Sequence, residues 1–232
     1  MIKGIIFDKD GTLFDFNATW GTWTRRMLQA EAGDDPARFD ALARVLGYDL
    51  TTDRFLPGSI VIAETVDIVA DHIRQVIPEV SKPDLLARMN AAAAQVTQIE
   101  AVPLAPYFAS LRAQGLRLGI ATNDAEAPAR RHLERAGITP HFDFIAGYDS
   151  GHGAKPGPGQ LLGFCAQTGL GPAECIMVGD SRHDLDAGRA AGMRTIGVLT
   201  GPALRGELAP HADAVLDHIG NIPDWLAAEN LI

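Results

Sequence analysis

Short apolar segments that end in polar residues recur at the start of the chain and throughout its second half. The first, residues 5–7, is β-prone and does not alternate, which is typical of a strand buried on both faces of a sheet. Further strands are expected over residues 116–121, 142–146, 175–178, 195–199 and 214–216. Segments with helical character separate these strands, and the alternation predicts an α/β fold with a doubly wound parallel sheet.

The segment between the first strand and residue 100 has a different pattern. Residues 17–99 are predicted to be almost entirely helical, with no strand pattern. One helix is expected to begin at Ser59, because apolar residues follow at three- and four-residue spacing up to Ile77. Since the first strand belongs with the later ones, we predict a core domain of residues 1–16 and 101–232 and an inserted all-α domain of residues 17–100.

Polar residues follow several of the predicted strands. Asp8 and Asp10 come directly after the first strand, and Gly11 then lets the chain turn away. Later strands are followed by Thr122, Asn123, Lys155, Asp180 and Asp184. Because parallel strands end at one edge of the sheet, where open α/β sheets bind ligands, we expect these side chains to lie together. Two carboxylates about 4 Å apart repel by about 4 kcal/mol at an effective dielectric of about 20, so the acidic pair requires a cation unless it is a solvated strand end.

The motifs resemble those of the haloacid dehalogenase superfamily in order and spacing. They are Asp-x-Asp-Gly-Thr at 8–12, Ala-Thr-Asn at 121–123, Lys-Pro at 155–156 and Gly-Asp-Ser-x-x-Asp at 179–184. The resemblance implies that Asp8 is the nucleophile of a phosphoryl transfer and forms an aspartyl phosphate. It implies that Asp10 is the general acid and then the base, its proton favoured by the neighbouring Asp8 charge, and that the helical insert is a cap.

The same resemblance implies a magnesium site and a phosphate site. Asp8, Asp180 and the backbone carbonyl of Asp10 are the expected Mg²⁺ ligands, and Asp184 is expected to hold a metal-bound water or to orient Lys155. The expected phosphate-binding residues are Thr122, Asn123 and Lys155.

Each of these residues also has an ordinary structural interpretation. Taken singly, Thr122 is more often a strand-end cap, Lys155 a solvated loop charge and Asp184 a helix N-cap. Lys9 stands where the superfamily usually has an apolar residue. We expect it to be solvated or paired with a nearby acid, and we assign it no role.

Asp10, the second aspartate of the Asp-x-Asp motif, indicates which class of substrate to expect. Dehalogenases of the superfamily lack it, since a halide leaves without a proton, so Asp10 favours phosphate esters. The resemblance is strongest to phosphoglycolate phosphatase-like members, and 2-phosphoglycolate is therefore the leading substrate. Trp20, Trp23 and Arg54 are candidate specificity residues, Arg54 as a partner for a substrate carboxylate. Core packing of the tryptophans and solvation of Arg54 are the competing interpretations.

Three alternatives remain open. A sugar-phosphate mutase would share every motif and differ by protecting its phosphorylated intermediate from water. A phospho-acceptor signalling domain also uses Asp, Thr and Lys on a parallel sheet, but would place its acceptor after an internal strand. A non-catalytic phosphate- or metal-binding protein has no use for the full acidic set.

Composition limits the partners. The 232-residue chain carries a net charge of -9, which argues against nucleic acid and against anionic membranes. No signal peptide is visible at Met1, and Cys165 and Cys175 lack metal-ligand spacing, so a reducing cytoplasm is expected. The expected partner is a small phosphorylated metabolite, and the oligomeric state is left open.

Overall fold

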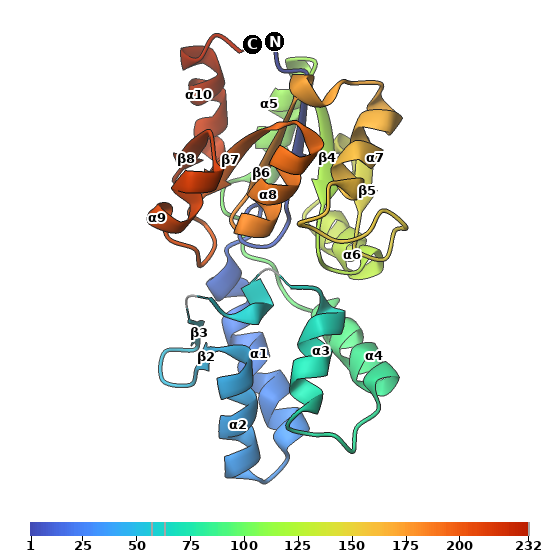
Figure 1. Ribbon diagram of the computed structural model, residues 1–232, viewed down its shortest axis with the longest axis vertical. Coiled ribbons are helices and arrows are strands. Elements are labelled where there is room, and N and C mark those ends of the chain that lie inside the picture. The colour runs from blue at the N-terminus through green and yellow to red at the C-terminus, as the bar shows by residue number, and fades with distance from the viewer. Residues whose placement is uncertain (57, 63, 232) are drawn as a thin grey trace.

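The computed structural model describes residues 1–56, 58–62 and 64–231, and these form a sheet half and a helical half stacked along the long axis (Figure 1). The sheet half contains a six-stranded, fully parallel sheet with the strand order β5-β4-β1-β6-β7-β8. This confirms the predicted doubly wound α/β fold. The strands are β1 (Gly4–Phe7), β4 (Arg117–Ala121), β5 (Phe144–Ala146), β6 (Cys175–Gly179), β7 (Arg194–Val198) and β8 (Ala214–Leu216).

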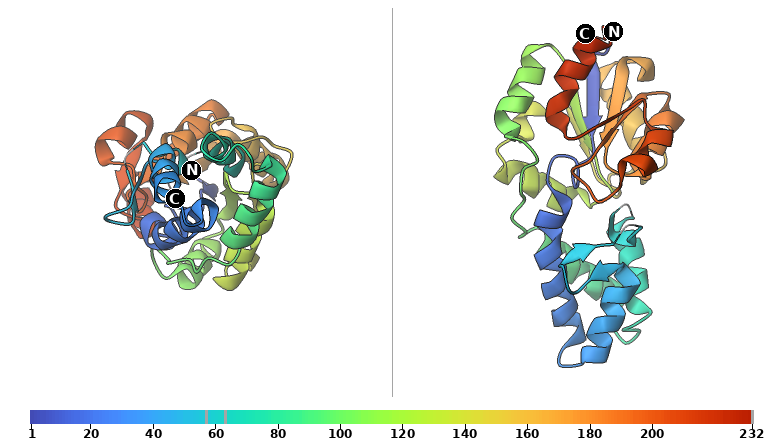
Figure 2. Two further views of the ribbon diagram at one scale, coloured as in Figure 1. Left: turned by 90° about the horizontal axis from the view of Figure 1, so that it is seen from below. Right: turned by 90° about the vertical axis from the view of Figure 1, so that its left-hand side faces the viewer.

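Strand β1 lies inside the sheet, and all four of its residues are buried. Ile5 and Phe7 join the hydrophobic cluster under α5 (Leu104–Ala113), α6 (Glu126–Arg135) and α10 (Ile222–Ala228), whereas Ile6 joins the cluster under α7 (Gly159–Thr168) and α8 (Arg182–Ala191). Helices therefore cover both faces of the sheet (Figure 2). This is why the first strand is apolar at consecutive positions.

The helical half is the segment inserted after β1, and it has a hydrophobic cluster of its own. Its helices are α1 (Phe16–Ala32), α2 (Pro36–Leu46), α3 (Val66–Arg74) and α4 (Lys82–Ala93). Each begins after a residue whose side-chain oxygen accepts a backbone N–H of the first turn, as N-caps do: Asp15, Asp35, Thr65 and Ser81. Separate hydrophobic clusters support the predicted division into two domains, whose boundaries at 16/17 and 100/101 stay a prediction.

Two local features of the insert differ from the prediction. A short antiparallel pair, β2 (Tyr48–Asp49) and β3 (Arg54–Phe55), interrupts the helices. The expected helix begins at Val66 instead of near Ser59, because the Ser59 hydroxyl donates to the Leu46 carbonyl and a 3₁₀ turn, η1 (Ile60–Ile62), follows.

The remaining elements are short connections. They are η2 (Thr139–His141), η3 (Pro172–Glu174), α9 (Arg205–Leu208), η4 (Ala209–His211) and η5 (Ile219–Asn221). Both termini lie at the end of the sheet half that is remote from the insert (Figure 1). None of the helices in the described part of the chain is both long enough and apolar enough to serve as a membrane span.

Candidate active site

Three carboxylates meet at the edge of the sheet that faces the insert. Asp8 follows β1, Asp180 follows β6, and Asp184 lies in the first turn of α8; one oxygen of each lies within 4.8 Å of the others. All three are buried, and among the described residues Asp180 Oδ2 has no hydrogen-bond partner. Burial and the charges of Asp184 and Asp8 raise the pKa of Asp180 well above its usual value. A buried, oxygen-only, negatively charged set of this kind fits a hard divalent cation such as Mg²⁺.

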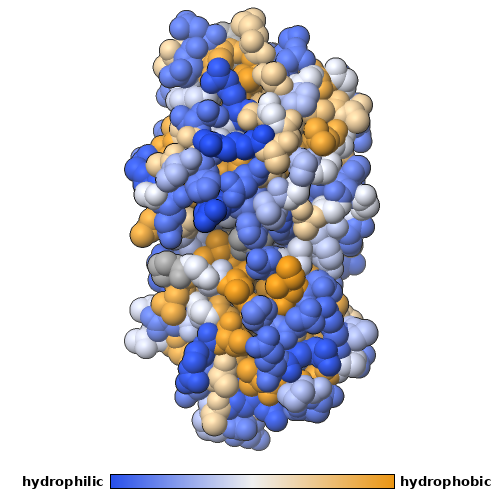
Figure 3. Space-filling model, in the orientation of Figure 1, coloured by the Kyte–Doolittle hydropathy of each residue, from blue (hydrophilic) through white to orange (hydrophobic). Residues whose placement is uncertain are grey.

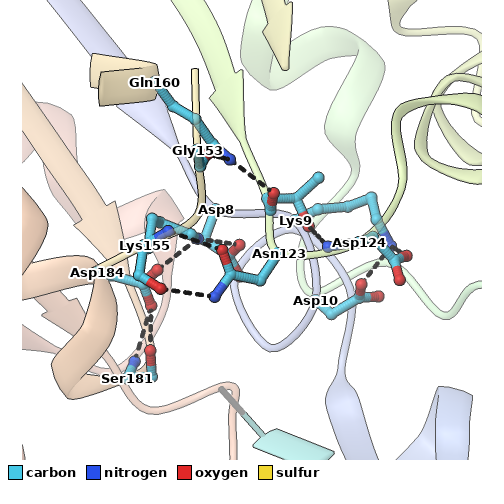
Figure 4. Close-up of polar contacts among 11 residues, drawn as sticks. Asp8, Lys9, Asp10, Asn123, Asp124, Gly153, Lys155, Gln160, Ser181 and Asp184 are labelled. Carbon is cyan, nitrogen blue, oxygen red and sulfur yellow. Dashed lines mark hydrogen bonds and ion pairs between the residues drawn. The ribbon is translucent and has the colours of Figure 1, made fainter. Parts of the chain in front are cut away.

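Lys155, in the loop after β5, bridges two of these carboxylates (Figure 4). Its Nζ lies 2.6 Å from Asp8 Oδ1 and 2.5 Å from Asp184 Oδ1. Burial alone would lower the pKa of Lys155, but the charges of Asp184 and Asp8 outweigh burial and raise it. Burial raises the pKa of Asp8, and Lys155 opposes that shift. Lys155 is therefore a fixed cation beside the predicted nucleophile.

Asp184 is the third residue of α8 and Ser181 is the N-cap, so the interpretation of Asp184 as a helix N-cap is wrong. Its Oδ2 accepts hydrogen bonds from the Ser181 backbone N–H at 3.0 Å and from the Ser181 hydroxyl at 2.7 Å, at the start of α8. Its Oδ1 faces Lys155. The helix terminus thus holds the carboxylate that orients the lysine.

Asn123 ties two strand-end loops together. Its Nδ2 donates to the Lys155 carbonyl, and its Oδ1 accepts from the Lys155 backbone N–H, both at 2.9 Å. Thr122 is buried beside it, with its Oγ1 accepting from the Asp124 N–H at 3.1 Å. Gln160 reinforces the loops, because its Nε2 donates to the carbonyls of Thr122 and Gly153. Phosphoryl binding by Thr122 and Asn123 stays a prediction, whereas positioning of Lys155 by Asn123 is observed.

Lys9 is fully buried, and it forms ion pairs with Asp10 and Asp124. Its Nζ also lies 3.2 Å from His132 Nδ1 and 5.7 Å from the centroid of the Trp20 ring. His132 Nε2 donates to the Ala93 carbonyl of α4, so Nδ1 is the acceptor that faces Lys9. The expected pairing with an acid is present, but Lys9 is not solvated.

The Asp10 side chain lies between Lys9 and Trp20, whose Nε1 donates to Asp10 Oδ1 at 2.9 Å. Burial would raise the pKa of Asp10, but the charges of Lys9 and His132 and these hydrogen bonds outweigh burial and hold it below its usual value. The expectation that the Asp8 charge keeps Asp10 protonated is therefore wrong for this arrangement. The reason is the buried cation at position 9.

Two glycines let the loops approach Asp180. Gly11 has a φ of 77°, and a Cβ atom there would lie 2.3 Å from Asp180 Oδ2. A Cβ atom at Gly201 would lie only 1.7 Å from the same oxygen. Real Cβ atoms do not approach that closely, so both positions require glycine for Asp180 to keep its place.

The site opens into a pocket shared with the insert. Trp20 and Trp23 line it and pack edge-to-face on each other, with ring centroids 5.2 Å apart. Arg54, by contrast, is exposed on β3 and is not among the described residues that line the pocket. Substrate contact by the two tryptophans stays a prediction, while this arrangement does not place Arg54 at the site.

Several residues of the site have no role that the motifs alone would assign. Asp124 directly follows the Ala-Thr-Asn motif, so its strand-end position was a usable signal. Ser181 stands inside the Gly-Asp-Ser motif and was equally visible. Gln160 and His132 lie on helices and outside the motifs, and only the fold shows that they reach the site.

Comparison with known proteins extends over both halves. The sequence profile of the haloacid dehalogenase-like hydrolases matches residues 2–192. A phosphoglycolate phosphatase of Rhodospirillum rubrum is 30% identical over 97% of this chain and 91% of its own. A solved HAD family hydrolase of Deinococcus radiodurans R1 with bound phosphate and sodium is 27% identical, with a TM-score of 0.69 over 100% of this chain and 97% of that one. A structure from Haemophilus somnus 129PT, described as a predicted phosphoglycolate phosphatase, has the same fold, with a TM-score of 0.74, 19% identity and 97% of both chains covered.

Proposed function

The chain belongs to the haloacid dehalogenase-like hydrolases, and we propose that it hydrolyses phosphomonoesters of small metabolites through an aspartyl phosphate on Asp8. One observation carries the proposal. The Asp8 carboxylate, at the end of a central strand, lies 2.6 Å from a buried lysine and within 4.8 Å of two further carboxylates. This combines a nucleophile with a cation for the phosphoryl group and a set of metal ligands.

In the first step, an Asp8 oxygen attacks phosphorus. A new O–P bond forms, the ester O–P bond breaks, and the leaving alkoxide takes a proton from Asp10. Lys155 neutralises charge on the phosphoryl oxygens and on Asp8. Asn123 contributes by holding the Lys155 backbone in place through its two hydrogen bonds.

In the second step, water attacks the phosphorus of the aspartyl phosphate and Asp10 accepts the water proton. The bond between phosphorus and the Asp8 oxygen breaks, which regenerates the Asp8 carboxylate and releases inorganic phosphate. Free Asp10 is held as a carboxylate by Lys9 and Trp20, which is the form this step needs. A phosphate dianion that binds nearby raises the pKa of Asp10 and so favours the protonated form for the first step. Asp10 is then protonated when the phosphate dianion is bound nearby and is a carboxylate when it is not.

The acidic set fits Mg²⁺, and this is supported by the buried Asp180 Oδ2, which has no hydrogen-bond partner among the described residues. Asp8, Asp180 and the backbone carbonyl of Asp10 would hold the ion, with Asp184 beside them. The bound ion supplies positive charge that stabilises the transferring phosphoryl group.

The names of the relatives make 2-phosphoglycolate the first ester to test, since the Rhodospirillum rubrum protein is called a phosphoglycolate phosphatase. The predicted cation for its carboxylate, Arg54, does not line the pocket.

Phosphate release from a panel of phosphomonoesters tests the proposal, with Mg²⁺ and with a chelator. Release should depend on the metal and disappear in Asp8→Asn, while Asp224→Asn, an exposed carboxylate on α10, should keep wild-type rates. A folded protein that releases no phosphate from any ester contradicts the proposal. A stable phosphoenzyme that transfers its group to a sugar phosphate points to a mutase instead.

A further inference from the structure

The pocket above Asp8 has a volume of about 100 Å³, and its wall on the insert side is mostly apolar. Side chains from α1, η1 and α4 form this wall, among them Trp20, Trp23, Met27, Val61 and Met89. In Figure 3, hydrophobic residues also reach the surface of the insert near its junction with the sheet half. An apolar wall favours an apolar ligand group, because burial removes both surfaces from water.

The charged residues of the pocket are predominantly acidic. Asp8, Asp10, Asp124 and Asp184 come from the core, and Glu64 comes from the insert. Among the described residues that line the pocket, Lys155 is the one Lys or Arg, and two carboxylates already share it. A carboxylate on the leaving group would therefore meet apolar side chains, Glu64 and the uncharged polar groups of Thr24 and Asn90, but no cation of its own.

Three arginines of the insert are paired with carboxylates elsewhere. Arg25 pairs with Asp53, Arg88 donates twice to Glu31, and Arg38 pairs with Glu79. None of the three lines the pocket. Arg54 is exposed on β3, as described above.

Building on the proposed phosphatase activity, we infer that the preferred substrate is a phosphomonoester whose leaving group is small, uncharged and apolar, and not a phosphorylated carboxylic acid. Desolvation of a carboxylate that gains no cationic partner is costly, whereas an alkyl or aryl group gains from the wall formed by Trp20, Trp23 and Met27. The phosphoryl group is the same in both classes of substrate, and Lys155 and a cation held by the acidic set would bind it in either case.

Two pairs of esters isolate the carboxylate. Ethyl phosphate and 2-phosphoglycolate differ only in a carboxylate that replaces a methyl group, and n-butyl phosphate and 4-phosphooxybutanoate differ in the same way. We expect kcat/KM to be at least about tenfold higher for the alkyl member of each pair. We also expect n-butyl phosphate to exceed ethyl phosphate, because it covers more of the wall.

Two substitutions of Met27, which lines the pocket from α1, test the cause. Met27→Lys supplies the missing cation and should shift the kcat/KM ratio towards the carboxylate member in both pairs. Met27→Gln introduces a polar side chain of similar length to lysine but without the charge. This variant should not shift the kcat/KM ratio. Arg54→Gln should leave the ratio unchanged, because this side chain lies outside the pocket.

The outcomes separate the two claims. No phosphate release from these four esters or from any other ester of the panel contradicts the proposed phosphatase activity. Release from other esters but from none of these four contradicts the inferred leaving group alone. Release with a preference for the carboxylate members contradicts the inferred leaving group and leaves the phosphatase activity standing. A loss of activity on the carboxylate members alone in Arg54→Gln also overturns the inference, since it would place that arginine at the leaving group.

Discussion

The Lys9 ammonium lies 3.1 Å from the Asp124 carboxylate, inside the protein, and pairs with Asp10 as well. Lys9 thus links the loop after β1 to the loop after β4. On the other side of the site, Lys155 likewise forms ion pairs with two carboxylates, those of Asp8 and Asp184. Each of the two buried lysines therefore compensates two carboxylates (Figure 4). The predicted nucleophile, Asp8, and the predicted acid–base group, Asp10, are paired with different lysines.

Lys9→Met should remove the cation from one of these pairs. Two largely buried carboxylates then lose their partner, so we expect the free energy of unfolding to fall by about 3–5 kcal/mol. Urea unfolding measures this change. The matched control is Lys3→Met, which breaks an exposed pair with Glu174 and should cost at most about 1 kcal/mol. Equal stability of the two variants would contradict the structural role of Lys9.

Gly201→Ala should weaken metal binding. The added Cβ would lie 1.7 Å from Asp180 Oδ2, so the carboxylate must move out of the acidic set. We expect the Mg²⁺ concentration for half-maximal activity to rise by about 10–100-fold, as for other changes that disturb metal ligands. Gly206→Ala, where a Cβ meets nothing within 4 Å, is the control. A normal Mg²⁺ requirement in Gly201→Ala would argue against Asp180 as a ligand.

His132 should make stability depend on pH. Burial and the nearby Lys9 charge lower the pKa of His132 to about 4, from 6.5. Between these values the unfolded chain binds the extra proton, so stability rises with pH and is lost as pH falls through the window. The full effect is about 3 kcal/mol. Denaturant unfolding from pH 4 to pH 7 should show a flatter dependence in His132→Gln than in the wild type, and identical slopes would exclude this contribution.

Much of the fold could be predicted because strand signals are local. The run at residues 5–7 is apolar at every position, and the structure buries Ile5 and Ile6 on opposite faces. Asp8 and Asp180 reach the same edge because all the strands of the sheet are parallel, which follows from their alternation with helices. The start of α3 at its N-cap Thr65 was not predicted, because by residue type Ser59 is an equally good N-cap candidate.

The pairing of side chains could not be predicted in the same way. Nothing next to Lys9 in the sequence shows that Asp124 and His132, more than 100 residues later, enclose it. Whether Arg54 faces the pocket or the solvent depends on the orientation of β3. A strand of two residues has no periodic pattern from which this orientation could be predicted. Charge compensation and pocket lining are properties of the folded chain.

Trapping the phosphoenzyme tests the central claim most directly. Asp10→Asn with 4-nitrophenyl phosphate isolates the first step, because nitrophenolate leaves without a proton while the variant lacks the base for the second step. We predict a burst of about one nitrophenolate per active site, and phosphate on the peptide that contains Asp8 after rapid quenching. Asp8→Asn should show neither. Turnover by the wild-type protein with no burst in Asp10→Asn, or with the phosphate on another residue, would contradict Asp8 as the nucleophile.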